Sequence, residues 1–307
     1  MAFQKTLEQN FIDALNQLHD QPASWWRKLV DSSDVFLAIR NNYINAYSCG
    51  MSIGKIVHEG RSIRLLVHEE YLTLTGPDPY VDLLAAQTSR TRQVVFDEKG
   101  YLAHLSRIKK RAGRFAGDER KGTNKVACRV LTVLDMEAAF EDRMEEPDPE
   151  NEQEVLADRG RMDLIVLAAD LRLVVVEAKL YANGELRAKG TPKVCSQLEE
   201  YHRFLTSQRQ SLEAAYRNVV SIFGRLRGGF FEKRAGHPNW VKGMATPASI
   251  SIDPVPRLLI FGFDELQKRG IQENAAQIQS HVTIPGFDRG SVIAVGGTTS
   301  IKEAHLA

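Results

Sequence analysis

The sequence predicts an α+β protein, and three patterns along the chain support this fold class. Two runs of β-branched and apolar residues, at 162–168 and 172–180, flank a short turn as in a β-hairpin. Residues 35–68 alternate between strand-like runs and turn signals. Apolar residues recur at helical spacing in residues 7–18, and a long helix is predicted at 192–223. We therefore expect β-sheets flanked by helices.

Residues 1–95 are predicted to form an N-terminal α+β module. After the first helix, Trp25 and Trp26 open a second short helix and are expected to be core or interface residues. Four strands should follow, separated by Asn-Asn, Gly and Glu-Gly turn signals, at residues 35–40, 43–47, 52–58 and 62–68. Three roles stay open for this module: it could recognise substrate, mediate dimerisation or lie over the larger domain.

The rest of the chain is predicted to divide into a helical connector at 96–123, which carries a basic segment, and a larger domain at 124–307. The total of 307 residues is long for one simple domain, so two domains are plausible.

The composition indicates a soluble, cytoplasmic protein. Hydrophobic residues make up 43% and charged residues 26% of the chain, and no apolar run is long enough to span a membrane. The N-terminus lacks the basic-then-apolar pattern of a signal peptide. The three cysteines are few and widely spaced, which indicates reduced thiols and argues against a zinc or disulfide framework. The formal net charge of +1 gives no global affinity for a polyanion.

Three charged residues interrupt the apolar hairpin. Glu177 and Lys179 lie two positions apart, so their side chains point to the same face of a strand. If the turn is centred on Asp170, Asp163 lies directly opposite Glu177, with Cβ atoms roughly 4.5–5.5 Å apart. Charged groups are rare in such surroundings unless they are paired or bind a metal. The pattern predicts an active site.

The chemistry of these side chains favours metal-assisted phosphodiester hydrolysis. Two adjacent carboxylates repel each other, and an incomplete cage of oxygen ligands suits Mg²⁺ or Mn²⁺. Such an ion can polarise a phosphoryl oxygen and supply hydroxide near neutral pH. Lys179 would orient the attacking water or neutralise charge on the phosphate.

Asp163, the spacing to Glu177-Ala-Lys179 and the downstream Gln197-Leu-Glu-Glu-Tyr201 resemble the PD-(D/E)xK nuclease superfamily. That superfamily includes restriction endonucleases, Holliday-junction resolvases and repair and phage-defence nucleases. The resemblance covers roughly residues 124–296, and Met162 replaces the proline of the usual Pro-Asp dipeptide.

The resemblance implies a restriction-endonuclease-like core, with a central mixed sheet flanked by helices. Its element order is a helix, a three-stranded meander, then helix, strand, helix and strand. In this chain the corresponding segments are 124–143, 154–159, 162–168, 172–180, 192–223, 257–263, 264–280 and 291–295.

The resemblance also implies roles for the site residues. Asp163 and Glu177 would bind Mg²⁺ or Mn²⁺, Lys179 would be the catalytic lysine, and Gln197 would help to shape the site. Relatives often add a glutamate from the preceding helix as a further metal ligand. We favour Glu137 for this position, because it shares a helical face with apolar residues; the alternatives are Glu141 and then Glu154.

Nucleic acid is the expected partner, and DNA is favoured over RNA because most relatives with this pattern act on DNA. An endonuclease in host defence or DNA repair is implied, and nucleases of this type often dimerise. The N-terminal module could also keep the site silent until an activating partner or ligand arrives. The predicted contacts with nucleic acid come from two segments rich in cations and from one aromatic residue near the site. They are Lys109, Lys110, Arg111, Tyr201, Arg225 and Arg227.

Two other functions stay open. A non-catalytic nucleic-acid-binding or assembly module could retain the nuclease fold, although it would have little reason to keep carboxylates beside phosphates. An enzyme acting on another phosphoester ranks last, because the chain has no Gly-rich phosphate-binding loop of the P-loop type.

Overall fold

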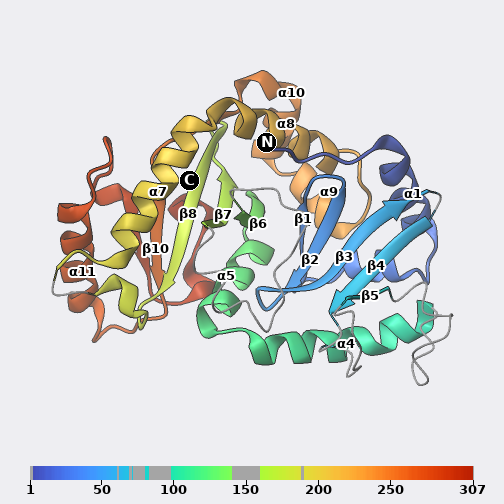
Figure 1. The fold of residues 1–307 in the computed structure, drawn as a ribbon, viewed down its shortest axis with the longest axis horizontal. Coiled ribbons are helices and arrows are strands. Elements are labelled where there is room, and N and C mark those ends of the chain that lie inside the picture. The colour runs from blue at the N-terminus through green and yellow to red at the C-terminus, as the bar shows by residue number, and fades with distance from the viewer. Residues whose placement is uncertain are drawn as a thin grey trace. The chain divides into compact units, whose positions relative to one another are not determined.

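The computed structural model describes residues 3–60, 62–68, 71, 80–82, 98–139, 160–187 and 190–306, and it has the mixed α+β composition that the sequence predicts (Figure 1). The chain divides into two compact units. The C-terminal unit comprises Met1–Gln4, Arg129–Arg217 and His237–Ala307, and the N-terminal unit comprises Lys5–Cys128 and Asn218–Gly236. The division after Cys128 lies close to the predicted start of the second domain, but the return of Asn218–Gly236 to the N-terminal unit was not predicted.

The N-terminal unit contains a five-stranded antiparallel sheet with its strands in sequence order. This meander confirms the four predicted strands and adds a short fifth one. Asn42 and Cys49 take positive φ at the first two turns, where turn residues are expected to do so. The strands are β1 (Phe36–Ile39), β2 (Tyr43–Ser48), β3 (Met51–Glu59), β4 (Ser62–His68) and β5 (Tyr80–Asp82).

The helices of this unit bury several of its aromatic residues. Trp25 and Trp26 have exposed fractions of 1% and 0%, which confirms that they are core residues. Arg234 is also buried, and its guanidinium donates a hydrogen bond to the carbonyl of Ala127 and lies over the ring of Phe230. The helices are α1 (Gln9–Asp20), α2 (Trp25–Val30), α4 (Glu98–Phe115), α5 (Asp118–Arg129) and α9 (Gly229–Ala235).

The C-terminal unit contains a mixed six-stranded sheet. Three strands form an antiparallel meander, and the central strand of the sheet then pairs in parallel with a strand from much later in the chain. The path across the sheet is β11-β10-β8-β7-β6, and β9 pairs with β8 off this path. The strands are β6 (Val133–Ala139), β7 (Arg161–Leu167), β8 (Arg172–Leu180), β9 (Ser251–Ile252), β10 (Arg257–Phe261) and β11 (Val292–Val295).

One predicted element of this unit is wrong. The helix expected at 124–143 ends at Arg129, and the following residues form β6 instead. Val133 and Leu134 fit one face of a helix, but a short apolar run fits a buried strand equally well, and here it completes the sheet beside β7. The strand predicted at 154–159 lies outside the described residues.

The helix predicted at 192–223 is interrupted at Gln208 and forms two helices, the second of which passes from the C-terminal to the N-terminal unit. The α-helices here are α7 (Lys193–Ser207), α8 (Arg209–Phe223), α10 (Pro238–Ala245), α11 (Lys268–His281) and α12 (Glu303–Leu306). The 3₁₀ turns are η2 (Gly184–Leu186), η3 (Pro247–Ser249), η4 (Arg289–Ser291) and η5 (Thr298–Ser300). No helix in the described part of the chain is long and apolar enough to cross a membrane.

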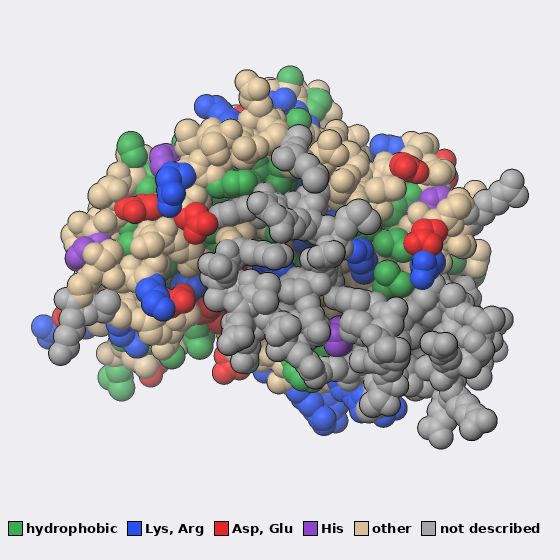
Figure 2. All heavy atoms as spheres, in the orientation of Figure 1, with side chains coloured by type: hydrophobic (Ala, Val, Ile, Leu, Met, Phe, Trp, Pro, Cys, Tyr) green, Lys and Arg blue, Asp and Glu red, His purple; other side chains and the backbone are tan. Residues whose placement is uncertain are grey.

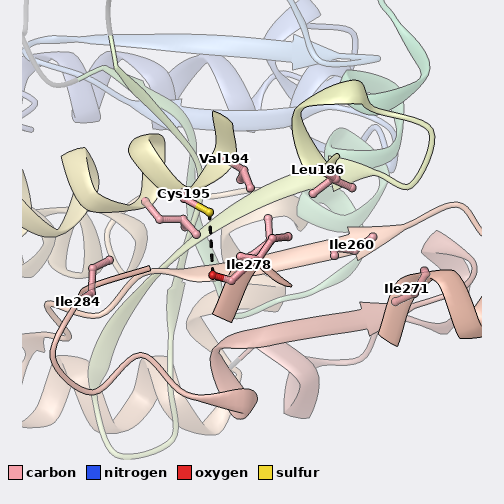
Figure 3. Close-up of a cluster of buried hydrophobic side chains, with 9 residues drawn as sticks. Leu186, Val194, Cys195, Ile260, Ile271, Ile278 and Ile284 are labelled. Atoms are coloured by element: carbon pink, nitrogen blue, oxygen red, sulfur yellow. Dashed lines mark hydrogen bonds between the residues drawn. The ribbon is translucent and has the colours of Figure 1, made fainter. Parts of the chain in front are cut away.

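A compact apolar cluster lies where α7 and α11 meet β10 (Figure 3). The Cys195 thiol points into this cluster and lies 3.9 Å from the carbonyl oxygen of Ile278. Burial raises the pKa of this thiol to about 11, as expected for a packing residue. Because the cluster ties α7 to the sheet, it also holds the helix that carries Gln197 and Tyr201. Its members are Leu186, Val194, Cys195, Leu198, Leu258, Ile260, Ile271, Ile278 and Ile284.

Candidate active site

The register of β7 and β8 brings Asp163 and Glu177 together. The paired residues run from Leu167↔Leu173 to Leu164↔Val176, so the next step of the ladder places Asp163 opposite Glu177. The Ala178 N–H donates a 2.8 Å hydrogen bond to Asp163 Oδ2, which ties the aspartate to the neighbouring strand. The predicted hairpin, with its turn around Asp170, is therefore confirmed.

Glu177 and Lys179 form a buried ion pair on the same face of β8. The Lys179 ammonium lies 2.8 Å from Glu177 Oε1, and the exposed side-chain fractions are 9% for the lysine and 1% for the glutamate. The pair can be this buried because β8 is an inner strand, with β7 and β10 on its two sides. A charged pair in such a position needs further hydrogen bonds to offset its lost hydration.

Tyr201 supplies one of these bonds, which the sequence did not reveal. Its hydroxyl lies 2.7 Å from Glu177 Oε2, is also in contact with the Arg161 carbonyl, and accepts a 3.1 Å hydrogen bond from Gln197 Nε2. The side chain is completely buried, so the predicted contact of Tyr201 with nucleic acid is wrong for this arrangement. Gln197 thus reaches Glu177 through Tyr201, and the only sequence signal was that the two residues lie one helical turn apart.

Glu185 is a second partner of Lys179 that the sequence analysis missed. Its Oε2 lies 2.8 Å from the Lys179 ammonium, and 40% of its side chain is exposed. It lies on η2, where the Asn183 side chain accepts a hydrogen bond from the Glu185 N–H. Lys179 therefore bridges a buried carboxylate and a solvent-facing one.

Glu137 lies beside Asp163, although on a strand and not on the predicted helix. The flanking pairs Met136↔Leu164 and Ala138↔Met162 place it opposite Asp163 in the ladder. Glu137 has a φ of 53°, a left-handed conformation that is uncommon for a residue with a side chain. Its carboxylate lies 3.8 Å from the Arg161 guanidinium. The alternatives Glu141 and Glu154 lie outside the described residues.

The site concentrates negative charge. Burial raises the pKa of Asp163 well above its usual range, and the charges of Glu177 and Glu137 raise it further. Burial acts to lower the pKa of Lys179, but the attraction and hydrogen bonds of Glu177 and Glu185 outweigh it and raise that pKa. Lys179 is therefore a cation at neutral pH. Burial followed by the Glu177 and Asp163 charges raises the pKa of Tyr201, which keeps its hydroxyl neutral.

The donor set fits a hard divalent cation. Four carboxyl groups, from Asp163, Glu177, Glu137 and Glu185, accompany two cations, Lys179 and Arg161, so the site has an excess of two negative charges when all four are ionised. Mg²⁺ is commonly held by one or two carboxylates together with water and substrate phosphate, a set that Asp163 and Glu177 can supply. Among the described residues, no group of three or more His, Cys, Asp or Glu is arranged to hold a metal ion, so no complete protein cage is present there.

The predicted basic contacts belong to the N-terminal unit, and most are paired there. Lys109 forms a 2.7 Å ion pair with Asp34, and Arg227 pairs with Asp20 at 2.6 Å. Arg225 donates a hydrogen bond to the Gln9 side chain. Lys110 and Arg111 lie on α4, where Lys110 is exposed and Arg111 is half-buried.

Replacing Tyr201 with phenylalanine should destabilise the protein by about 1–3 kcal/mol, because the buried Glu177 carboxylate and the Arg161 carbonyl lose a donor. Urea unfolding monitored by circular dichroism measures this change. Tyr181→Phe is the matched control, since the half-buried Tyr181 hydroxyl makes no hydrogen bond within the described residues. Equal stability of the two variants would show that the Tyr201 hydroxyl does not support the site.

Comparisons with known proteins supply no family for this chain. No protein-family model, no curated protein and no solved structure matches it. The resemblance to PD-(D/E)xK nucleases therefore stays a prediction from the sequence.

Proposed function

We propose that this protein is a divalent-metal-dependent nuclease with a restriction-endonuclease-like core in its C-terminal unit. The observation that carries the proposal is the placement of Asp163 opposite Glu177 on adjacent strands, with Lys179 paired to Glu177 on the same face. Natural proteins rarely bury such a charged group in an apolar hairpin without a chemical use for it.

The order of elements supports the proposal. A helix, α5, leads into the β6-β7-β8 meander, and α7 follows it. The chain then returns as β10 parallel to β8, and α11 leads to β11 parallel to β10. This is the succession that the superfamily resemblance implies, with β6 as the first strand of the meander and with α8, α9, α10 and β9 added between α7 and β10.

The side chains divide the chemistry between them. Asp163 and Glu177 would hold Mg²⁺ or Mn²⁺, which when bound polarises the phosphodiester and makes hydroxide available near neutral pH. The Lys179 ammonium would orient the attacking water and neutralise charge that develops on the phosphate. Tyr201 and the Ala178 N–H keep the two carboxylates in place. Glu137, beside Asp163, would complete the acidic set.

One observation favours a second candidate, a nucleic-acid-binding or assembly module without catalysis. Both oxygens of Glu177 already have partners, Lys179 and Tyr201, and no three-ligand group is preformed in the described residues. The charge excess at Asp163 argues for the enzyme, because a module that binds phosphates gains nothing from clustered carboxylates.

Cleavage assays test the proposal directly. Plasmid, linear duplex and single-stranded DNA, and RNA, are incubated with Mg²⁺, Mn²⁺ or EDTA. The wild type should cut in a metal-dependent manner, with DNA the expected substrate, and Lys179→Ala should lower the rate roughly 10²–10³-fold because a transition-state cation is lost. Lys302→Ala, at an exposed lysine of the same unit, is the matched control and should leave the rate unchanged.

The outcomes separate the candidates. Metal-dependent binding of nucleic acid without turnover would favour the non-catalytic module. Equal cutting by the wild type and Lys179→Ala would contradict the assignment of this site. A role in host defence or in repair can be inferred only from the substrate that the protein prefers, because a fold by itself does not determine the biological role.

A further inference from the structure

The basic segment of the N-terminal unit forms a stripe along one face of α4. Arg107, Lys110, Arg111 and Arg114 follow the i, i+3, i+4, i+7 spacing that aligns side chains on a helix. The opposite face is apolar and buried, through Leu105, Ile108 and Ala112. The four cations are called the basic stripe below.

The cations of this segment differ in their exposure and in their ion pairs. Lys109 lies off the stripe and pairs with Asp34. Arg107, Lys110 and Arg114 are exposed, and the described part of the chain places no carboxylate within ion-pairing distance of them. Lysine and arginine side chains gather along the lower edge of Figure 2, where α4 runs in Figure 1.

The stripe cations repel one another. The pKa of Arg111 is lowered, first by burial and then by the charges of Arg107 and Arg114. An anionic partner along the stripe would relieve this repulsion. The favourable partner is therefore one that presents several negative charges in a row.

We propose that the basic stripe of α4 binds the phosphate backbone of a nucleic acid. Seven residues of helix span roughly 10 Å, and duplex DNA carries one phosphate charge per about 1.7 Å of axis, so several phosphates lie within reach. The ring of Phe115, 54% exposed next to Arg114, adds an aromatic surface on which a base can stack.

A lipid surface fits the stripe less well. Helices that bind membranes turn an apolar face towards the bilayer beside their cations. On α4 the apolar face is already buried within the unit, so the stripe offers charge with little apolar area to insert. The choice of nucleic acid as the polyanion rests on the proposed nuclease function, whereas the stripe itself rests on the geometry of α4.

Binding measured in EDTA tests the inference without cleavage. Fluorescence anisotropy follows labelled single-stranded and duplex DNA, and RNA of the same sequence, over a range of salt concentrations. The variant is Arg107→Gln/Lys110→Gln/Arg114→Gln, because glutamine has a helix propensity close to that of lysine and arginine. The control, Lys233→Gln/Arg289→Gln/Lys302→Gln, removes the same charge from exposed positions elsewhere.

The stripe variant should bind at least about tenfold more weakly at low salt, and the slope of log K against log salt should fall by roughly 2–3, or 0.7–0.9 per lost phosphate contact. The control should change affinity less than about twofold, as expected for cations outside the contact. Melting curves check that both variants are folded.

The inference would be overturned by an equal loss of affinity in both variants, by an unchanged slope of log K against log salt in the stripe variant, or by no binding of nucleic acid by the wild type. Binding to vesicles of equal parts phosphatidylcholine and phosphatidylserine, without DNA or RNA binding, would assign the stripe to a lipid surface. If the protein binds nucleic acid through the stripe but cuts no substrate, only the nuclease proposal is contradicted. If the protein cuts and binds nucleic acid, and the stripe variant does both equally well, only this inference is contradicted.

Discussion

Asp163→Asn should abolish metal-dependent cleavage and at the same time make the metal-free protein more stable. The wild-type carboxylate is held in a buried position beside Glu177 and Glu137, which raises its pKa and costs folding free energy at neutral pH. Asparagine can still accept the Ala178 N–H bond, and its amide can donate to the neighbouring carboxylates. We expect a gain of about 0.5–2 kcal/mol in the free energy of unfolding, the range typical of a single stabilising substitution.

The same change should alter the pH dependence of stability. Because the folded state raises the pKa of Asp163, that state binds the proton more tightly than the unfolded chain does. The contribution of this proton binding to the free energy of unfolding is fully present below the ordinary carboxyl pKa of 3.8, and it is lost as the pH rises through the pKa of the folded state. Urea unfolding in EDTA, from about pH 4 to pH 8, should show this decline in the wild type and a smaller one in Asp163→Asn.

Added Mg²⁺ provides the second readout. At a hundredfold excess over its dissociation constant, it should stabilise the wild type by about 2.7 kcal/mol and leave Asp163→Asn nearly unchanged. Asp13→Asn, an exposed aspartate on α1, is the matched control and should behave as the wild type does. A destabilised Asp163→Asn that still responds to Mg²⁺ would contradict the role assigned to this carboxylate.

Lys179→Met should destabilise the protein by about 3–5 kcal/mol, because Glu177 is left buried without its cation. Most of this loss of stability comes from the Glu177 carboxylate, which stays buried without a counter-charge. The double variant Glu177→Gln/Lys179→Met should therefore be more stable than the sum of the single changes predicts, by about 1–3 kcal/mol. Urea unfolding of the four proteins of this cycle measures the coupling.

Lys268→Met is the control for the cost of removing a charged pair. Lys268 pairs with Glu265 on the surface, where such a pair contributes at most about 1 kcal/mol. Additive effects in the Glu177/Lys179 cycle would mean that the buried pair is not coupled. Lys179 would then be held mainly by the solvent-facing Glu185.

The structure shows why the hairpin could be predicted and the strand before it could not. Alternation along β7 and β8 and a short turn determine the cross-strand register locally, so Asp163 and Glu177 follow from sequence spacing. The run that became β6 has apolar residues that suit either a helix or a strand. Only its pairing with β7 decides between them, and that pairing also brings Glu137 beside Asp163.

The sequence by itself determined the hairpin, its three charged residues, the N-terminal meander and the position of the basic segment, because each depends on periodicity and turn residues within a short window. The tertiary structure decided which groups surround the charges: Tyr201 arrives on α7 and Glu185 on η2. It also decided that the Lys109 cation of α4 is neutralised by Asp34, which comes from a distant part of the chain. The Tyr201–Glu177 and Lys109–Asp34 contacts join residues far apart in sequence, and their selection depends on packing that no local pattern encodes.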